Sequence, residues 1–344
     1  MRSSRRTSKP SEGQARTGKP SEGRRIAVVL FQLGGPDSLE AVEPFLYNLF
    51  SDPDIIDFPL ATLARKPLAR FISSRRSKKV AEHYKEIGGK SPILALTNQQ
   101  ATALQKRLDK FIDAQVFVAM RYWNPLTDVA AASVADGKFD RIILLPLYPQ
   151  YSVTTSGSSI NEWSRRFASK GVEQKLVHHF YDNPKYIDAI VDNVNKALGS
   201  FRSIDRSKVT LVFSAHGLPL SVIQKGDPYQ DHIEQTVELV MKRGRWKSPH
   251  VLCYQSKVGG AKWLSPSLHQ TIHDLAEHGV KHVLVIPVAF LTDHVETLHE
   301  INVEAKHDAL RLGITNFVLM PALNDHPKLI EALADEVLKR AREV

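Results

Sequence analysis

Eight short runs rich in Val, Ile and Leu divide this chain into alternating apolar and amphipathic segments. Strands of a parallel sheet covered on both faces are apolar along their whole length, and the connections between them are usually helical. The alternation therefore predicts an α/β fold built from βα units. The expected strands are 26–33, 115–122, 141–147, 174–180, 208–214, 250–255, 282–290 and 316–320.

The third strand of each half ends in the same way, which indicates two halves of one architecture. Leu144-Leu145-Pro146-Leu147-Tyr148 in the first half corresponds to Val285-Ile286-Pro287-Val288-Ala289 in the second. A length of 344 residues also suits two domains. We expect two similar Rossmann-like domains, each with a mainly parallel four-stranded sheet flanked by helices, and an active-site cleft between them. Their expected limits are 25–200 and 205–326, followed by a final helix at 327–344.

The formal net charge of +9 is concentrated at the N-terminus. Residues 1–25 hold eight basic and two acidic side chains, or +6, which leaves +3 for the rest of the chain. Residues 1–24 are rich in Arg, Ser, Gly and Pro, and we predict a disordered basic tail. An organellar transit peptide is the alternative, although the tail has no apolar helical face. No nucleic-acid partner is expected, and any nucleic-acid binding should disappear when the tail is removed.

The cysteine content and the lengths of the apolar runs limit where in the cell we expect the protein to be. Cys253 is the single cysteine, which excludes an intramolecular disulfide and a four-thiolate metal site. No apolar run approaches the roughly 18 residues of a membrane span. We expect a cytoplasmic protein with room for peripheral membrane association. The segment 54–79 suggests where, because it mixes apolar side chains with Arg65, Lys66, Arg70, Arg75, Arg76, Lys78 and Lys79. The alternative is a helix with one face on the core and a solvated basic face.

Acids and imidazoles follow two of the expected strands. The octapeptide Asp293-His294-Val295-Glu296-Thr297-Leu298-His299-Glu300 follows the strand 282–290, and His216 follows the strand 208–214. Ligands bind at the carboxyl ends of parallel strands, so these side chains predict a site that handles protons or a metal ion. Glu296, Glu300 and Glu304 recur every four residues and would form one acidic line on a helix. A solvated helix face is the alternative.

Several motifs together resemble ferrochelatases, the enzymes that insert ferrous iron into a porphyrin, from about residue 26 to the C-terminus. These motifs are Leu33-Gly34-Gly35-Pro36, Met120-Arg121-Tyr122, Tyr148-Pro149-Gln150-Tyr151-Ser152, Ser214-Ala215-His216-Gly217-Leu218-Pro219, Gln255-Ser256-Lys257-Val258-Gly259 and Asp293-His294-Val295-Glu296-Thr297-Leu298. The resemblance implies the chelatase-type version of the two-domain fold. It also implies that the final helix returns to pack on the first domain.

The resemblance also implies roles for individual residues. His216, Glu296, Asp293 and His294 would be catalytic, with His294 and Glu296 facing His216 across the porphyrin. His216, Glu296, Glu300 and Glu304 would bind or guide the metal. In an apolar cleft beside other acids, the pKa of Glu296 should rise. The porphyrin-contacting residues would be Leu33, Arg75, Arg76, Ser91, Arg121, Tyr122, Tyr148 and Trp263.

Three functions remain open from sequence. The first is insertion of Fe2+ into protoporphyrin IX to give protohaem and two protons, as the last step of haem biosynthesis. A coproporphyrin III ferrochelatase of the same family is the second, and the apolar lip at 54–79 favours protoporphyrin over it. A non-catalytic tetrapyrrole or metal carrier is the third. We expect no permanently bound cofactor and no iron-sulfur cluster, because the chain lacks the Cys-rich C-terminal extension of animal ferrochelatases. The oligomeric state is left open.

Overall fold

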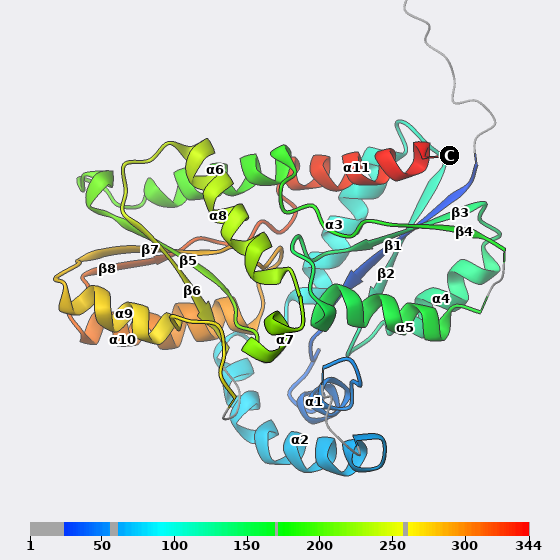
Figure 1. The fold of residues 1–344 in the computed structure, drawn as a ribbon, viewed down its shortest axis with the longest axis horizontal. Helices are drawn as coiled ribbons and strands as arrows, with labels where there is room; N and C mark the ends of the chain where they lie inside the picture. Colours follow the sequence, from blue (N-terminus) through cyan, green and yellow to red (C-terminus); the bar gives the residue numbers. More distant parts are fainter. Residues whose placement is uncertain (1–23, 56–60, 169–170, 257–260, 344) are drawn as a thin grey trace, which may run out of the picture.

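The computed structural model describes residues 24–55, 61–168, 171–256 and 261–343 of the chain, without the side chains of 61–63. Almost all of the predicted tail lies outside these ranges. So do Lys257, Val258 and Gly259 of the motif after the sixth strand and residues 56–60 of the predicted lip. Figure 1 shows two lobes side by side, each built on one sheet, with the helices α1 (Val42–Phe50) and α2 (Ala61–Glu86) projecting below the junction.

The two sheets have the same topology. The first contains β1 (Ile26–Gln32), β2 (Ala114–Met120), β3 (Arg141–Pro146) and β4 (Glu173–Leu176) in the order β2-β1-β3-β4. The second contains β5 (Thr210–His216), β6 (His250–Gln255), β7 (His282–Pro287) and β8 (Asn316–Leu319) in the order β6-β5-β7-β8. Neighbouring strands are parallel throughout. The predicted fold class, strand count and internal similarity are thus confirmed.

Two of the predicted strands end at least three residues earlier than the apolar pattern suggests. The run 282–290 leaves the sheet after Pro287. Residues 289–292 instead line a cleft whose walls come from both lobes. The run 174–180 ends at Leu176, and the amide of Phe180 then donates to the carbonyl of Pro149, 3.0 Å away. Apolar character continued past the sheet because these residues are buried by contacts other than strand pairing.

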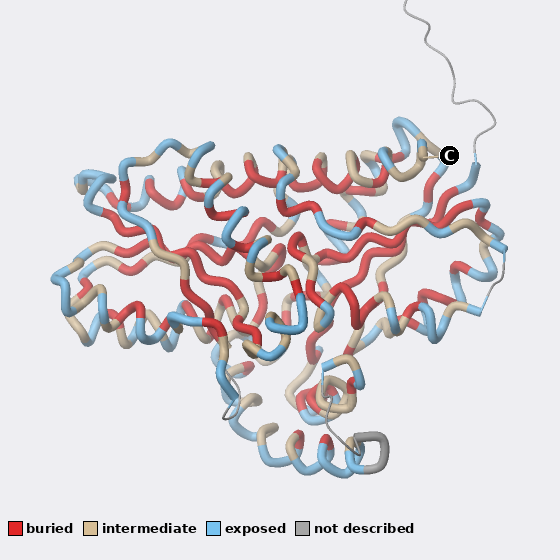
Figure 2. The backbone as a smooth tube through the Cα atoms, viewed as in Figure 1, coloured by how far each residue is buried: buried red, intermediate tan, exposed pale blue. Residues whose placement is uncertain are grey.

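Helices cover both faces of each sheet (Figures 1 and 2). The central strands β1, β3, β5 and β7 are almost entirely buried, which explains their continuous apolar sequence. The remaining helices are α3 (Ile93–Leu108), α4 (Thr127–Asp136), α5 (Ser158–Arg166), α6 (Pro184–Leu198), α7 (Leu220–Gln224), α8 (Tyr229–Gly244), α9 (Leu268–Glu277), α10 (Lys306–Arg311) and α11 (Pro327–Arg342), with the π-helices η1 (Val153–Gly157) and η3 (Glu296–Ala305) and the 3-10 helix η2 (Arg206–Lys208).

The C-terminal helix α11 packs on the first lobe, although it follows the second in the chain. The buried guanidinium of Arg141 donates to the carbonyls of Arg340 and Ala341 at 3.0 and 2.9 Å. One apolar core, including Leu333 and Val337 of α11, continues from the first sheet into the second. The lobes therefore share part of their core. The limits 25–200 and 205–326 stay predictions. Within the described ranges, no helix has the length and hydropathy needed to cross a bilayer.

Candidate active site

His216 and Glu296 form a hydrogen-bonded pair at the edge of the second sheet where the carboxyl ends of its strands lie. His216 is the last residue of β5, and Glu296 is the first residue of η3, which follows β7. Nδ1 of His216 lies 2.9 Å from Oε2 of Glu296. The side chains are 34% and 21% exposed, so the pair sits at a partly open surface. The expectation that His294 and Glu296 face His216 across a porphyrin stays a prediction, and in this structure Glu296 contacts His216 directly.

The backbone around His216 is packed too closely for a side chain at the next position. A Cβ atom on Gly217 would lie 2.8 Å from the carbonyl oxygen of Gln255, inside van der Waals contact. The hydroxyl of Tyr229 donates to the carbonyl of His216 at 3.0 Å. The close packing at Gly217 and the hydrogen bond from Tyr229 hold the end of β5 in place. They thereby fix the backbone from which the His216 side chain extends.

Ser256 joins Glu296 to the next acid of the line, Glu300. Its hydroxyl lies 3.0 Å from Oε2 of Glu296 and 2.6 Å from Oε2 of Glu300, and its amide donates to Oε1 of Glu300 at 2.7 Å. Ser256 has a φ of 65°, in the left-handed region that non-glycine residues seldom adopt. This conformation presents both the amide and the hydroxyl to the acids, and strain held at such a position is often functional.

The pKa values of the two acids move in opposite directions. Burial alone would raise the pKa of Glu296, but the charge and hydrogen bond of His216 outweigh it and lower the pKa to about 2. The predicted rise at Glu296 is therefore wrong. The rise occurs at Glu300, whose pKa burial and the negative charge of Glu296 raise. For His216, burial acts to lower the pKa, yet Glu296 raises it overall.

These contacts form a continuous path for a proton. The Ser256 hydroxyl carries one hydrogen, so it can donate to only one carboxylate at a time. A protonated Glu300 can donate to the Ser256 oxygen while Ser256 donates to Glu296, which satisfies both short contacts. This arrangement orients the bonds inward, from Glu300 to Glu296. Once Glu300 has released its proton to solvent, the Ser256 hydroxyl can turn to donate to Glu300, and a proton passed from His216 to Glu296 can then move through Ser256 toward the outer part of η3.

The two other residues predicted to be catalytic, His294 and Asp293, have different surroundings. His294 is buried, lines the main cleft, and its Nδ1 lies 3.0 Å from the carbonyl of Thr292. The Asp293 carboxylate instead makes hydrogen bonds within the protein. It accepts from the Asn324 side chain at 2.9 Å and lies 3.2 Å from the Thr297 hydroxyl. In the described structure, Asp293 thus positions the start of η3.

The cleft beside the pair has a volume of about 100 Å³. Its walls are mainly apolar and come from both lobes, with the polar groups of His216, His294 and Glu296 on one side. Of the predicted porphyrin contacts, Leu33 and Tyr148 line this cleft. The other described lining residues are Gln32, Ile93, Leu147, Gln150, Ser152, Thr154, Thr155, Leu218, Tyr229, Ala289, Phe290, Leu291 and Thr292.

Arg121 and Tyr122 lie behind the cleft wall in a buried polar network. An oxygen of Asp52 accepts a bond from the Tyr122 hydroxyl at 2.5 Å, and Ser158 donates to the same oxygen at 2.5 Å. The Arg121 guanidinium lies 2.8 Å from the other Asp52 oxygen and borders a second, more polar cavity. Their predicted contact with a porphyrin stays a prediction.

The remaining predicted contacts surround the cleft without lining it in the described structure. Ser91 is buried, and its hydroxyl accepts from the amide of Ile93, a lining residue. Trp263 pairs with Pro219 and packs near Gly217. On α2, Arg75 is exposed and Arg76 stacks over the Phe50 ring at 5.5 Å.

Sequence reasoning missed Ser256 as a site residue, and also Tyr229 and Asp52. A signal for Ser256 was present, because it follows β6 at the same sheet edge as His216. Asp52 lies in a loop far from Tyr122 in sequence, and nothing in the sequence pattern connects them.

The fold and the site together define the class as a two-lobed α/β protein with an imidazole–carboxylate pair at a cleft, the fold that solved chelatases share. Among solved structures, SirB from Bacillus subtilis with Fe3+ is 13% identical and has a TM-score of 0.54. The match covers 92% of this chain and 96% of that one. CbiX, described as the terminal enzyme for siroheme biosynthesis in denitrifying bacteria, is also 13% identical, with a TM-score of 0.50, over 92% and 99% of the two chains. At this identity the likeness establishes the fold.

The family follows from sequence. A ferrochelatase family model matches residues 25–341. The ferrochelatase of Geotalea daltonii is 48% identical over 91% of this chain and 97% of the relative, and that of Gloeothece citriformis is 44% identical over 93% and 83%. The chain belongs to the ferrochelatase family, which inserts metal into porphyrins.

Proposed function

We propose that this protein inserts Fe2+ into protoporphyrin IX to give protohaem and two protons, the last step of haem biosynthesis. The observation that carries the proposal is the 2.9 Å contact between His216 and Glu296 at the mouth of an apolar cleft. Insertion removes two pyrrole N–H protons, so the site needs a base beside the ring and a way to carry protons off.

His216 supplies the base in this proposal. Its neutral imidazole accepts a pyrrole proton, and the neighbouring carboxylate of Glu296 stabilises the resulting imidazolium. Ser256 and Glu300 then conduct the proton outward along η3. Imidazole and carboxylate together also bind Fe2+ without the tight hold of thiolates, which suits an ion that must move on into the ring.

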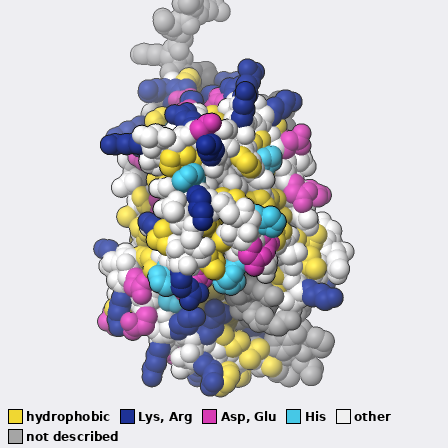
Figure 3. Space-filling model, turned by 90° about the vertical axis from the view of Figure 1, so that its left-hand side faces the viewer, with side chains coloured by type: hydrophobic (Ala, Val, Ile, Leu, Met, Phe, Trp, Pro, Cys, Tyr) yellow, Lys and Arg dark blue, Asp and Glu magenta, His cyan; other side chains and the backbone are white. Residues whose placement is uncertain are grey.

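Two features support protoporphyrin over the more acidic coproporphyrin. The cleft walls are mainly apolar. On α2, Leu68 and Phe71 are 37% and 63% exposed between basic side chains. Figure 3 shows Lys and Arg beside hydrophobic side chains toward the end of the molecule where α2 lies. We propose that this surface contacts an anionic membrane, where an apolar porphyrin partitions.

Anaerobic turnover tests the proposal. Purified protein receives Fe2+ with protoporphyrin IX or coproporphyrin III, and the porphyrin spectrum reports insertion, with His216→Ala as the inactive control. Faster haem formation from protoporphyrin, lost in His216→Ala, supports the proposal. Preference for coproporphyrin assigns the other substrate to the same family. Tight porphyrin binding without insertion of metal overturns the enzyme assignment in favour of a carrier.

A further inference from the structure

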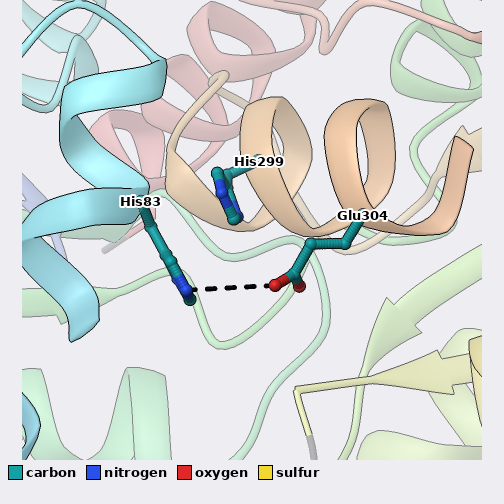
Figure 4. A group of neighbouring side chains, drawn as sticks. All are labelled: His83, His299 and Glu304. Atoms are coloured by element: carbon teal, nitrogen blue, oxygen red, sulfur yellow. Dashed lines mark ion pairs between the residues drawn. The ribbon is translucent and has the colours of Figure 1, made fainter. Parts of the chain in front are cut away.

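Two histidines and an acid meet at the outer part of η3, away from the His216–Glu296 pair. One nitrogen each of His83 and His299 and one carboxylate oxygen of Glu304 all lie within 4.8 Å of one another. His83 comes from α2, whereas His299 and Glu304 come from η3 (Figure 4). His83 Nε2 lies 3.9 Å from Glu304 Oε1. The imidazole and carboxylate groups present here are those that divalent transition metals accept as ligands.

One ring nitrogen of His299 has no hydrogen-bond partner among the described residues. The side chain is 4% exposed, and its Nε2 lies 3.1 Å from a carboxylate oxygen of Glu86. Nδ1 is buried and has no hydrogen-bond partner among the described residues. A proton on Nε2 that is donated to Glu86 leaves a lone pair on Nδ1. Metal-binding histidines commonly have this arrangement, with the second nitrogen held by a carboxylate.

The two imidazoles stack on one another. Their ring centroids are 4.1 Å apart and the planes differ by 11°. Two imidazolium ions at this distance would repel, so the arrangement favours neutral rings, the form that binds metal. His83 is 24% exposed and its ring can turn toward a shared ion, whereas His299 is fixed by its surroundings.

We propose that His83, His299 and Glu304 form an outer site for a divalent transition-metal ion such as Fe2+. The ion would link α2 to η3 at the end of the acidic line that begins at Glu296. The imidazoles make this more than an acidic surface, because they select transition metals over Mg2+ and Ca2+.

Titration with Co2+ under reducing, anaerobic conditions tests the site directly, since bound Co2+ is visible in its absorption bands. His216→Ala serves as the parent, because it removes the inner imidazole ligand. We expect this parent to retain one Co2+ with nitrogen ligation, and the added change His83→Ala to raise the Kd at least tenfold. His278→Ala is the matched control, because His278 is exposed and bonds within its own helix. It should leave the Kd unchanged.

A second measurement separates the site from the proposed function. In the chain with His216 intact, His83→Ala is assayed for Co2+ binding and for turnover with Fe2+ side by side. Unchanged Co2+ binding in the His83→Ala variant overturns the outer site, whatever the turnover shows. Loss of Co2+ binding in a protein that never inserts metal supports the site and overturns the proposed function instead. An unaltered unfolding midpoint for His83→Ala establishes that the variant folds.

Discussion

The contact between His216 and Glu296 predicts a pH-dependent coupling free energy. At 2.9 Å, two unit charges attract by about 1.4 kcal/mol in bulk water and by about 6 kcal/mol at an effective dielectric constant of about 20. Because the side chains are 34% and 21% exposed, solvent screens the pair and the value belongs in the lower part of this range. We expect a coupling of about 2 kcal/mol.

The pH at which this coupling is largest follows from the two pKa shifts. The pKa of His216 is raised from 6.5 in the folded state. Its stabilisation is complete below pH 6.5 and is lost as pH rises through the folded pKa. The pKa of Glu296 is lowered from 4.5 to about 2. Its stabilisation is present above pH 4.5 and is lost as pH falls toward 2. The coupling should therefore peak between pH 4.5 and 6.5.

A double-mutant cycle in urea measures this coupling. The four proteins are the wild type, His216→Gln, Glu296→Gln and the double variant, and their free energies of unfolding are compared at about pH 6 and pH 9. The coupling should fall by about half or more at the higher pH, where the imidazole is neutral. A coupling below about 0.5 kcal/mol at pH 6, or one that is the same at both pH values, would refute the reasoning.

Four further predictions concern the relay, the buried networks and the lip. Glu300→Gln removes the protonated carboxyl of the relay and should lower kcat by about 10²-fold or more, which steady-state assays across pH would detect. Tyr122→Phe removes one of the buried donors to the Asp52 carboxylate, beside Ser158 and Arg121, and should cost about 1–3 kcal/mol of unfolding free energy in urea. Arg141→Ala frees two carbonyls of α11 and should cost about 1–3 kcal/mol for each, with faster amide exchange in that helix. Phe71→Asp should leave stability within about 0.5 kcal/mol but reduce sedimentation with anionic vesicles.

The sequence predicted the fold well because strands buried on both faces leave a local pattern. The central strands have almost no exposed residue, so each one is apolar along its length and can be recognised without knowledge of its neighbours. The ends of β4 and β7 were less predictable. Residues beyond β7 are apolar for another reason, since Ala289, Phe290 and Leu291 line the cleft. Beyond β4, Val177 and Phe180 are buried in the hydrophobic core.

The residues of the site were predictable individually, but their contacts were not. His216 and the acids of η3 stood out because they follow strands at one sheet edge. Pairing of His216 with Glu296 brings together residues 80 positions apart. That pairing reverses the expected pKa shift of Glu296, because an adjacent positive charge outweighs burial.

The sequence by itself determined the two parallel sheets, the repeated halves and the delivery of His216 and Glu296 to one edge. These features depend on local burial patterns and on the rule that parallel strands present their carboxyl ends together. The tertiary structure alone decided that Ser256 joins two acids, that Asp293 accepts from the amide of Ala322, and that His83 meets His299. Each of these contacts joins segments that are far apart in the sequence. A periodic pattern within one segment does not indicate which distant side chain that segment will contact.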